Sequence, residues 1–233
     1  MMKLLSSVGM RAIVQELAPI YETENKVSID IIYGSSSIIM DRIRAGEEAD
    51  LVILASPAIN LLREKGALLP GVDKCLASTG IGLSCPANAN HPDISTVDSL
   101  IKTLMQTKSI AYTTTGVSGL YFQQVLEKLG LLDQVSAKAV TMPEGQIASL
   151  LVNGSADLAV QLTSELVGYP GTEYIGPLPP ELQIEMSFSA SLFLGSKTVE
   201  KALDFLFFLS QTQWASIYSK NGMTQTLNHL GQK

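Results

Sequence analysis

Hydroxyl-bearing residues and glycines gather where predicted strands end and predicted helices begin. The clearest example is Gly34-Ser35-Ser36-Ser37, which follows an apolar run and precedes a helical pattern. A helix N-terminus leaves about four backbone N–H groups unpaired and carries roughly half a positive charge. Hydroxyls add donors, and glycine lets a ligand approach the backbone closely. Such a junction can bind an anion, or it can be an ordinary helix cap, because Ser, Thr and Gly are all common N-cap residues.

The same chemistry recurs at four junctions in the chain. The other three are Ser6-Ser7-Val8-Gly9, the stretch 113–119 (TTTGVSG) and Glu144-Gly145-Gln146. Their recurrence in successive strand–helix units favours a bound small anion over four independent caps. Ser36 is the leading side-chain ligand, with Ser35 and Ser37 in support. The full set of ligand-binding candidates at these junctions is Ser6, Ser7, Gly9, Ser35, Ser36, Thr115, Ser118, Gly119 and Gly145.

Two further candidates are a cation and a buried amide. Arg11 lies in the first turn of the first predicted helix, where a cation opposes the helix dipole. It is therefore either the partner of a ligand carboxylate or a surface arginine. Gln161 ends the apolar strand ADLAVQL and needs a hydrogen-bond partner if it is buried, which either a ligand or Ser164 would supply. Tyr33 ends a strand beside the second junction, where core packing is its expected role.

The elements that position these residues alternate along the chain. Short apolar runs followed by helix-length amphipathic stretches predict an α/β fold with a mostly parallel sheet in each of two lobes. The pattern changes near residue 80 and again after the proline-bearing connector GPLPPELQ. We therefore expect a discontinuous lobe 1, residues 1–79 plus 186–233, with lobe 2, residues 80–185, inserted into it. A ligand would bind in the interlobe cleft, outside the carboxyl ends of strands.

Two helical patterns complete this outline. The stretch 146–154 (QIASLLVNG) is predicted to form a helix after the fourth junction, and the stretch 198–222 is predicted to form one long C-terminal helix.

Composition excludes several classes of function. The chain has 233 residues, of which 46% are hydrophobic, so it can bury a sizeable core. A net charge of −6 without a basic run argues against a nucleic-acid partner. No apolar run reaches the roughly 18–20 residues of a membrane span. We expect Cys75 and Cys85 to be free thiols, and the isolated His91 and His229 predict no metal site. We expect no cofactor.

The N-terminal stretch MMKLLSSVGM contains no sustained apolar segment typical of a signal peptide. The expectation is a periplasmic protein if this chain is a processed mature form, and a cytoplasmic one if it is the complete gene product.

The stretches YGSSSIIMDRIRAGEEADLVILAS and GVSGLYFQQVLEKLG, with their strand–loop–helix frame, resemble the molybdate-binding-protein-like family of extracellular solute-binding proteins. The resemblance implies a type II periplasmic-binding-protein fold, the "Venus flytrap", that binds an oxyanion or small organic anion. It places a ligand serine at Ser36 and backbone donors at Ser118 or Gly119 and at Gly145. It also places Gly9 where the family has a serine, and Leu162 where the family has a tyrosine.

The stretches LSSVGMRAIVQELAP and QLTSELVGYPGTEYIGPLPPELQ are similar to the subgroup that includes bacterial aconitate isomerase. This similarity favours a di- or tricarboxylate ligand, for which Arg11 is a natural partner. The expected function is a monomeric solute-binding protein that serves an ABC transporter permease. One alternative is an isomerase that moves an allylic proton, with Glu144, Glu165 and Tyr112 as the titratable residues near the cleft. A cytoplasmic anion-sensing module is the other.

Overall fold

The computed structural model describes residues 1–226. Two compact units make up the chain. Unit 1 comprises Met1–Thr79 and Met186–Lys233, and unit 2 comprises Gly80–Glu185. His229, one of the two histidines of the sequence, lies outside the described residues. The α/β class expected from the sequence is confirmed, because each unit consists of one sheet with helices packed against it.

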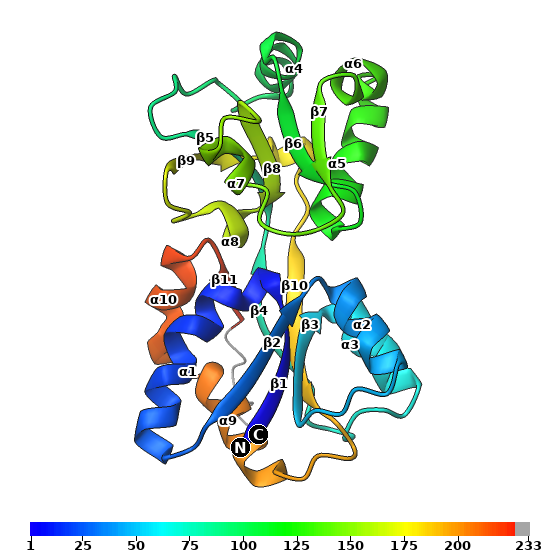
Figure 1. The fold of residues 1–233 in the computed structure, drawn as a ribbon, viewed down its shortest axis with the longest axis vertical. Coiled ribbons are helices and arrows are strands. Elements are labelled where there is room, and N and C mark those ends of the chain that lie inside the picture. Colours follow the sequence, from blue (N-terminus) through cyan, green and yellow to red (C-terminus); the bar gives the residue numbers. More distant parts are fainter. Residues whose placement is uncertain (227–233) are drawn as a thin grey trace. The chain divides into compact units, whose positions relative to one another are not determined.

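Unit 1 contains a six-stranded sheet in the order β11-β4-β10-β3-β1-β2 (Figure 1). Strand β1 is parallel to both β2 and β3, whereas β10 is antiparallel to β3 and β4, and β11 is antiparallel to β4. The sheet is therefore mixed rather than mostly parallel. Its strands are β1 (Met2–Ser7), β2 (Ile29–Gly34), β3 (Leu51–Ala55), β4 (Lys74–Thr79), β10 (Met186–Leu192) and β11 (Thr224–Gln225).

Helices cover both faces of the unit 1 sheet (Figure 1). On one face α2 and α3 bury Ile39 and Ile59 against Leu5 and Val52 of the sheet. On the other face α1 contacts α9 and α10. The helices are α1 (Arg11–Asn25), α2 (Ser36–Arg44), α3 (Ser56–Glu64), α9 (Val199–Leu209) and α10 (Ala215–Lys220), with short 3-10 turns η1 (Val8–Met10) and η3 (Thr212–Trp214).

The C-terminal helical pattern is interrupted, so the prediction of one long helix over 198–222 is wrong. Helix α9 ends at Leu209, and α10 begins only at Ala215. Two aromatic side chains accompany the break. The indole N–H of Trp214 donates to the Phe208 carbonyl at 2.8 Å, and the Tyr218 hydroxyl donates to the Leu209 carbonyl at 3.0 Å. These bonds satisfy carbonyl groups that a helix end leaves unpaired.

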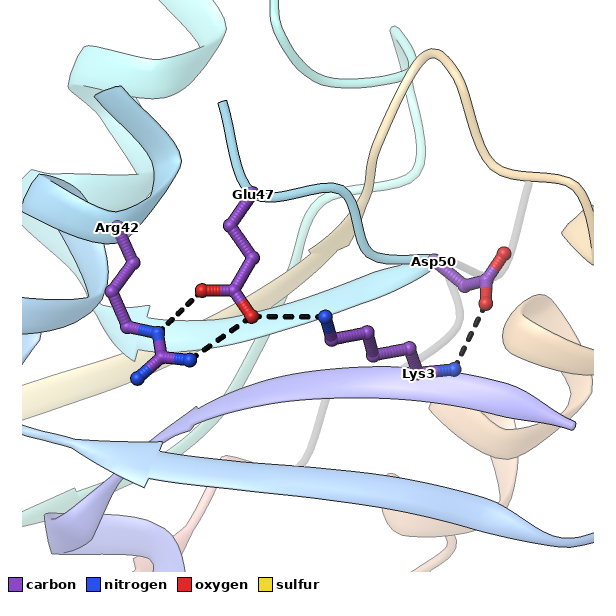
Figure 2. A network of polar contacts seen from close by, with 4 residues as sticks. All are labelled: Lys3, Arg42, Glu47 and Asp50. Carbon is purple, nitrogen blue, oxygen red and sulfur yellow. Dashed lines mark hydrogen bonds and ion pairs between the residues drawn. The ribbon is translucent and has the colours of Figure 1, made fainter. Parts of the chain in front are cut away.

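A polar network ties the start of β1 to the loop before β3 (Figure 2). The Lys3 ammonium donates to the Glu47 carboxylate at 2.9 Å, and Arg42 forms an ion pair with the same carboxylate. The backbone N–H of Lys3 donates to Asp50 at 2.9 Å. Asp50 also accepts hydrogen bonds from the Ser196 hydroxyl and from the backbone of the two following residues. Asp50 therefore links three separate segments of unit 1.

Unit 2 contains a five-stranded sheet in the order β7-β6-β8-β5-β9. Strand β6 is parallel to β7 and β8, whereas β5 is antiparallel to β8 and β9, so this sheet is also mixed. Helix α6 packs against both α4 and α5, and α7 packs on β5 and β8. The elements are β5 (Ile81–Pro86), β6 (Ile110–Thr113), β7 (Ala139–Met142), β8 (Leu158–Leu162), β9 (Thr172–Pro177), α4 (Val97–Gln106), α5 (Val117–Lys128), α6 (Leu132–Ser136), α7 (Ser149–Val152), α8 (Thr163–Leu166) and η2 (Pro180–Leu182).

The helix predicted over 146–154 is much shorter than expected. Only Ser149–Val152 is helical, because the preceding residues form an irregular loop. Gly145 has a φ of +112°, a conformation outside any right-handed helix, and the backbone N–H of Ile147 donates to a side chain. The fourth junction is therefore a structured loop rather than the first turn of a long helix.

The prediction for the two cysteines is confirmed. Both cysteines are free thiols. Pro57 stands in the first turn of α3, and Gly46 and Gly66 adopt positive φ just after α2 and α3 end. Over residues 1–226, no helix combines the length and apolar character needed to cross a bilayer.

Candidate functional site

The unit 1 candidates lie at one edge of the sheet. Because β1, β2 and β3 are parallel, their carboxyl ends share that edge. Ser6 lies opposite Tyr33, and Ser7 lies opposite Gly34 in the register of β1 and β2. Helices α1 and α2 begin just beyond these strand ends. The structure therefore brings together Ser6, Ser7, Gly9, Arg11, Ser35 and Ser36.

Their hydroxyls make hydrogen bonds within the protein. Ser35 is the N-cap of α2, and its oxygen accepts from the Ile38 N–H at 3.3 Å. Ser7 accepts from the Gly9 N–H at 3.3 Å, and fully buried Ser6 donates to the Ser7 carbonyl at 3.2 Å. A hydroxyl oxygen that accepts a bond still has a hydrogen to donate. Ser7 can therefore cap the 3-10 turn and bind an anion at the same time.

Ser36 links the second junction to the end of another strand. Its oxygen accepts a hydrogen bond from the Ala55 N–H at 3.1 Å, across from α2 to the end of β3. This bond also leaves the hydroxyl hydrogen free to donate. Ser37 is exposed, and its oxygen lies 2.9 Å from that of Ser35.

Arg11 is the first residue of α1, as the sequence predicts. Its guanidinium carbon lies 4.9 Å from the centroid of the Tyr33 ring. Within the described part of the chain, the buried Nε of Arg11 has no hydrogen-bond partner, and no carboxylate lies within 4.0 Å of its guanidinium. The cation is therefore held against an aromatic ring at a position that the helix dipole disfavours.

Tyr33 has a buried hydroxyl, which likewise has no hydrogen-bond partner among the described residues. Burial raises the pKa of Tyr33 to about 12, against the opposite influence of the Arg11 charge. The hydroxyl is therefore protonated throughout the physiological pH range, and it is a hydrogen-bond donor. Core packing, the role expected from the sequence, accounts for the ring and leaves this polar atom unexplained.

The unit 2 candidates also lie together. Strands β6, β7 and β8 are parallel, and the segment after β6 is tied to the segment after β7. The Thr114 N–H donates to the Met142 carbonyl at 2.9 Å. Both the N–H and the hydroxyl of Thr115 donate to the Pro143 carbonyl, at 3.1 and 2.5 Å. The Thr115 hydroxyl would have to exchange this bond to donate to an anion.

Helix α5 begins without a side-chain cap. Its N-cap residue is Gly116, and Ser118 and Gly119 follow in the first turn. A Cβ atom on Gly119 would lie 1.7 Å from the Thr113 carbonyl oxygen, so the helix start packs directly on the strand end. The first-turn N–H groups of a helix have no partner within the helix. In α5 these groups are available to an acceptor from outside.

Gln161 positions the loop at the fourth junction. Its side chain is only 2% exposed, and its amide nitrogen donates to the Gly145 carbonyl at 2.8 Å. Its amide oxygen accepts from the Ile147 N–H at 3.1 Å. The sequence predicted a ligand or Ser164 as the partner, and it did not anticipate this loop. Gly145 and Gln161 are thus brought together, with Gln161 supporting the backbone around Gly145.

Sequence reasoning passed over two hydroxyl residues at strand ends. Ser56 begins α3, and its oxygen lies 2.8 Å from that of Ser189. Thr163 follows β8, and its oxygen lies 3.1 Å from the Tyr174 hydroxyl. Both residues obey the same rule as the three hydroxyl-bearing junctions, a hydroxyl at the end of an apolar strand. That rule, applied to every strand, would have found them.

Comparison with known proteins identifies the family. Residues 2–224 match the family described as "Bacterial extracellular solute-binding protein". The chain belongs to this family. Its fold is also that of a molybdate-binding protein from Azotobacter vinelandii, with a TM-score of 0.81, 19% identity, and coverage of 96% of this chain and 99% of that one.

Two curated relatives are similar along nearly the whole sequence. Aconitate isomerase from a Pseudomonas species is 29% identical over 225 residues, covering 94% of this chain and 86% of the relative. The molybdate-binding protein ModA of Escherichia coli is 24% identical over 218 residues, covering 90% and 83% respectively. The resemblance inferred from the sequence motifs is thereby confirmed.

Proposed function

We propose that this solute-binding protein captures a small organic di- or tricarboxylate and delivers it to an ABC transporter. The ligand would be held by donors at the strand ends of unit 1 described above. The observation that carries the proposal is Arg11, a guanidinium at the start of α1 with no carboxylate within 4.0 Å among the described residues.

A ligand carboxylate would account for this placement. A cation at a helix N-terminus is disfavoured by the dipole, and an anion beside it reverses the sign of that interaction. Hydrogen bonds to charged groups contribute roughly 1.5–3 kcal/mol each, and micromolar binding requires about 8 kcal/mol. The planar fork of Arg11 and the hydroxyls of Ser7 and Ser36 offer about four such hydrogen bonds, which together reach this affinity.

Molybdate is the less favoured ligand. Gly9 supplies no hydroxyl, and Leu162, at the end of β8, is buried and apolar. The resemblance placed a ligand serine and a ligand tyrosine at these two positions. A tetrahedral oxyanion would therefore lose two side-chain donors, whereas an organic anion gains the charge of Arg11.

The membership in an extracellular family supports a site of action outside the cytoplasm and a membrane permease as partner. We propose both for this chain.

A second candidate function is isomerisation of an aconitate-type tricarboxylate. The observation in its favour is the 29% identity to aconitate isomerase over 94% of the chain. Moving an allylic proton requires a base within hydrogen-bond reach of the substrate. Tyr112 is buried, and its ring packs 5.5 Å from that of Phe122, which supports a core role. Glu144 and Glu165 remain the carboxylates near the unit 2 junctions.

A panel of anions tests the ligand class. Thermal shifts and calorimetry would be measured with citrate, cis- and trans-aconitate, molybdate, tungstate and sulfate, because a ligand above its Kd stabilises the native state. We expect a carboxylate to raise the Tm and Arg11→Ala to abolish the rise. Arg44→Ala is the matched control, since Arg44 is exposed and pairs with Asp41 on α2. A shift with molybdate or tungstate alone would overturn the carboxylate proposal.

An assay for conversion separates the two functions. The protein would be incubated with each aconitate isomer, and chromatography with absorbance detection would show whether the other isomer forms. If a carboxylate binds without being converted, the protein is a binding protein; if conversion occurs, the isomerase function holds.

A further inference from the structure

We propose that Arg11 and Tyr33 form a carboxylate-binding pair in which the Tyr33 hydroxyl is a specificity-determining donor. This inference rests on the proposed function, since it adds a second side chain to the same site. Tyr33 was expected from its sequence position to be a core residue.

The geometry of unit 1 brings the pair together. Arg11 begins α1 and Tyr33 lies near the end of β2, opposite Ser6 of β1. The guanidinium carbon lies 4.9 Å from the ring centroid, a cation–π contact that restrains the flexible arginine side chain. The pair thus stands at the same sheet edge as Ser7 and Ser36.

Both members of the pair present a buried polar atom without a partner in the described chain. These atoms are Arg11 Nε and the Tyr33 hydroxyl oxygen. Buried polar groups in native proteins are almost always hydrogen-bonded, so two such atoms in one contact pair require an explanation. An acceptor from outside the chain would satisfy both.

A carboxylate fits this requirement. An ionised carboxyl group only accepts hydrogen bonds, and its two oxygens match the planar fork of a guanidinium. Burial keeps the pKa of Tyr33 high, so the hydroxyl is a donor at neutral pH. Because the ring restrains the guanidinium, its planar fork is held in one orientation, which suits a planar carboxylate.

The test removes the hydroxyl and keeps the ring. Tyr33→Phe retains the cation–π contact, and we expect it to raise the carboxylate Kd about tenfold, the loss typical of one hydrogen bond to a charged group. We expect no fall in the Tm of the free protein, because the lost hydroxyl has no partner there. The Kd values for sulfate and molybdate, measured in the same buffer, should change much less.

Tyr21→Phe is the matched control. Tyr21 lies on α1, and its hydroxyl donates to the Lys201 carbonyl at 3.1 Å. This variant should lower the Tm of the free protein and leave the carboxylate Kd unchanged. Arg11→Lys keeps the charge but loses the planar fork, and it should weaken carboxylate binding as Tyr33→Phe does.

The outcomes separate this inference from the proposed function. If the wild-type protein binds no carboxylate, the proposed function fails, and the pair fails with it. If the wild-type protein binds a carboxylate and Tyr33→Phe leaves its Kd unchanged, only the role of Tyr33 is overturned. An equal loss of affinity for sulfate or molybdate would overturn the selectivity for carboxylates.

Discussion

The Ser36 hydroxyl oxygen accepts a hydrogen bond from the backbone N–H of Ala55 at 3.1 Å. This bond joins the start of α2 to the end of β3, so one serine connects two of the strand ends at the candidate site. A single side chain thus stabilises the site and remains able to donate its hydrogen to a ligand.

Ser36→Ala should therefore weaken both folding and binding. The Ala55 N–H would lose its acceptor, which costs about 1 kcal/mol in the free energy of unfolding, and the anion would lose a donor, which raises its Kd about tenfold. Chemical denaturation and calorimetry measure the two effects. Ser37→Ala is the control, because Ser37 is exposed, and it should change stability by less than about 0.5 kcal/mol. Equal effects of the two substitutions would contradict the role of Ser36.

Gln161→Leu should disorganise the loop after β7. The substitution leaves the Gly145 carbonyl and the Ile147 N–H without their side-chain partners. Each buried group left unpaired costs about 1–3 kcal/mol, so the free energy of unfolding should fall by roughly 2 kcal/mol or more. Denaturant unfolding measures this loss, and ligand affinity should fall with it. Unchanged stability would show that the loop does not depend on Gln161.

The alternation of strands and helices was readable from the sequence because hydrophobic periodicity reflects burial, which acts residue by residue. The direction of strand pairing was not readable from this pattern. The sequence predicted mostly parallel sheets, but β10 and β5 pair antiparallel with their neighbours, so both sheets are mixed. The break after α9 also escaped prediction. The helical pattern continues through it, and the carbonyls there are satisfied by Trp214 and Tyr218 from farther along the chain.

In the candidate site, too, local features were predicted from the sequence and contacts between distant segments were not. Ser35 and Ser36 were found from local chemistry, since a capping hydroxyl stands next to the helix it serves. The contact of Arg11 with Tyr33 was not found, because it depends on the register that places β2 beside β1. The hydrogen bonds from Gln161 on β8 to the loop after β7 were also missed, because they depend on how these strands are arranged in the sheet.

Gly119→Ala should destabilise unit 2 at the start of α5. The new Cβ would lie 1.7 Å from the Thr113 carbonyl oxygen, so the helix must move away from the strand. Overpacking of this kind costs about 1–3 kcal/mol. Gly195→Ala is the matched control, because no atom lies within 4 Å of a Cβ there. Thermal unfolding would measure both variants, and equal Tm values would contradict the close packing at Gly119.

Acid should destabilise unit 1 through the network of Glu47 and Asp50 (Figure 2). The hydrogen bond from Arg42, together with the one from Lys3, lowers the pKa of Glu47 to about 2. Burial opposes ionisation of Asp50, but hydrogen bonds from Lys3 and from the Ser196 segment outweigh it, and the pKa of Asp50 is also lowered. A carboxylate whose pKa is lower in the folded state stabilises the protein above its unfolded pKa, about 4.3 for Glu. For Glu47 that contribution is lost as the pH falls from about 4.3 to about 2.

Glu47→Gln should flatten the dependence of the unfolding free energy on pH across this window. Glu48→Gln is the control and should not flatten it, because the side chain of Glu48 is 83% exposed. Denaturant unfolding at a series of pH values checks this, and parallel curves for Glu47→Gln and the wild type would rule out the contribution of Glu47.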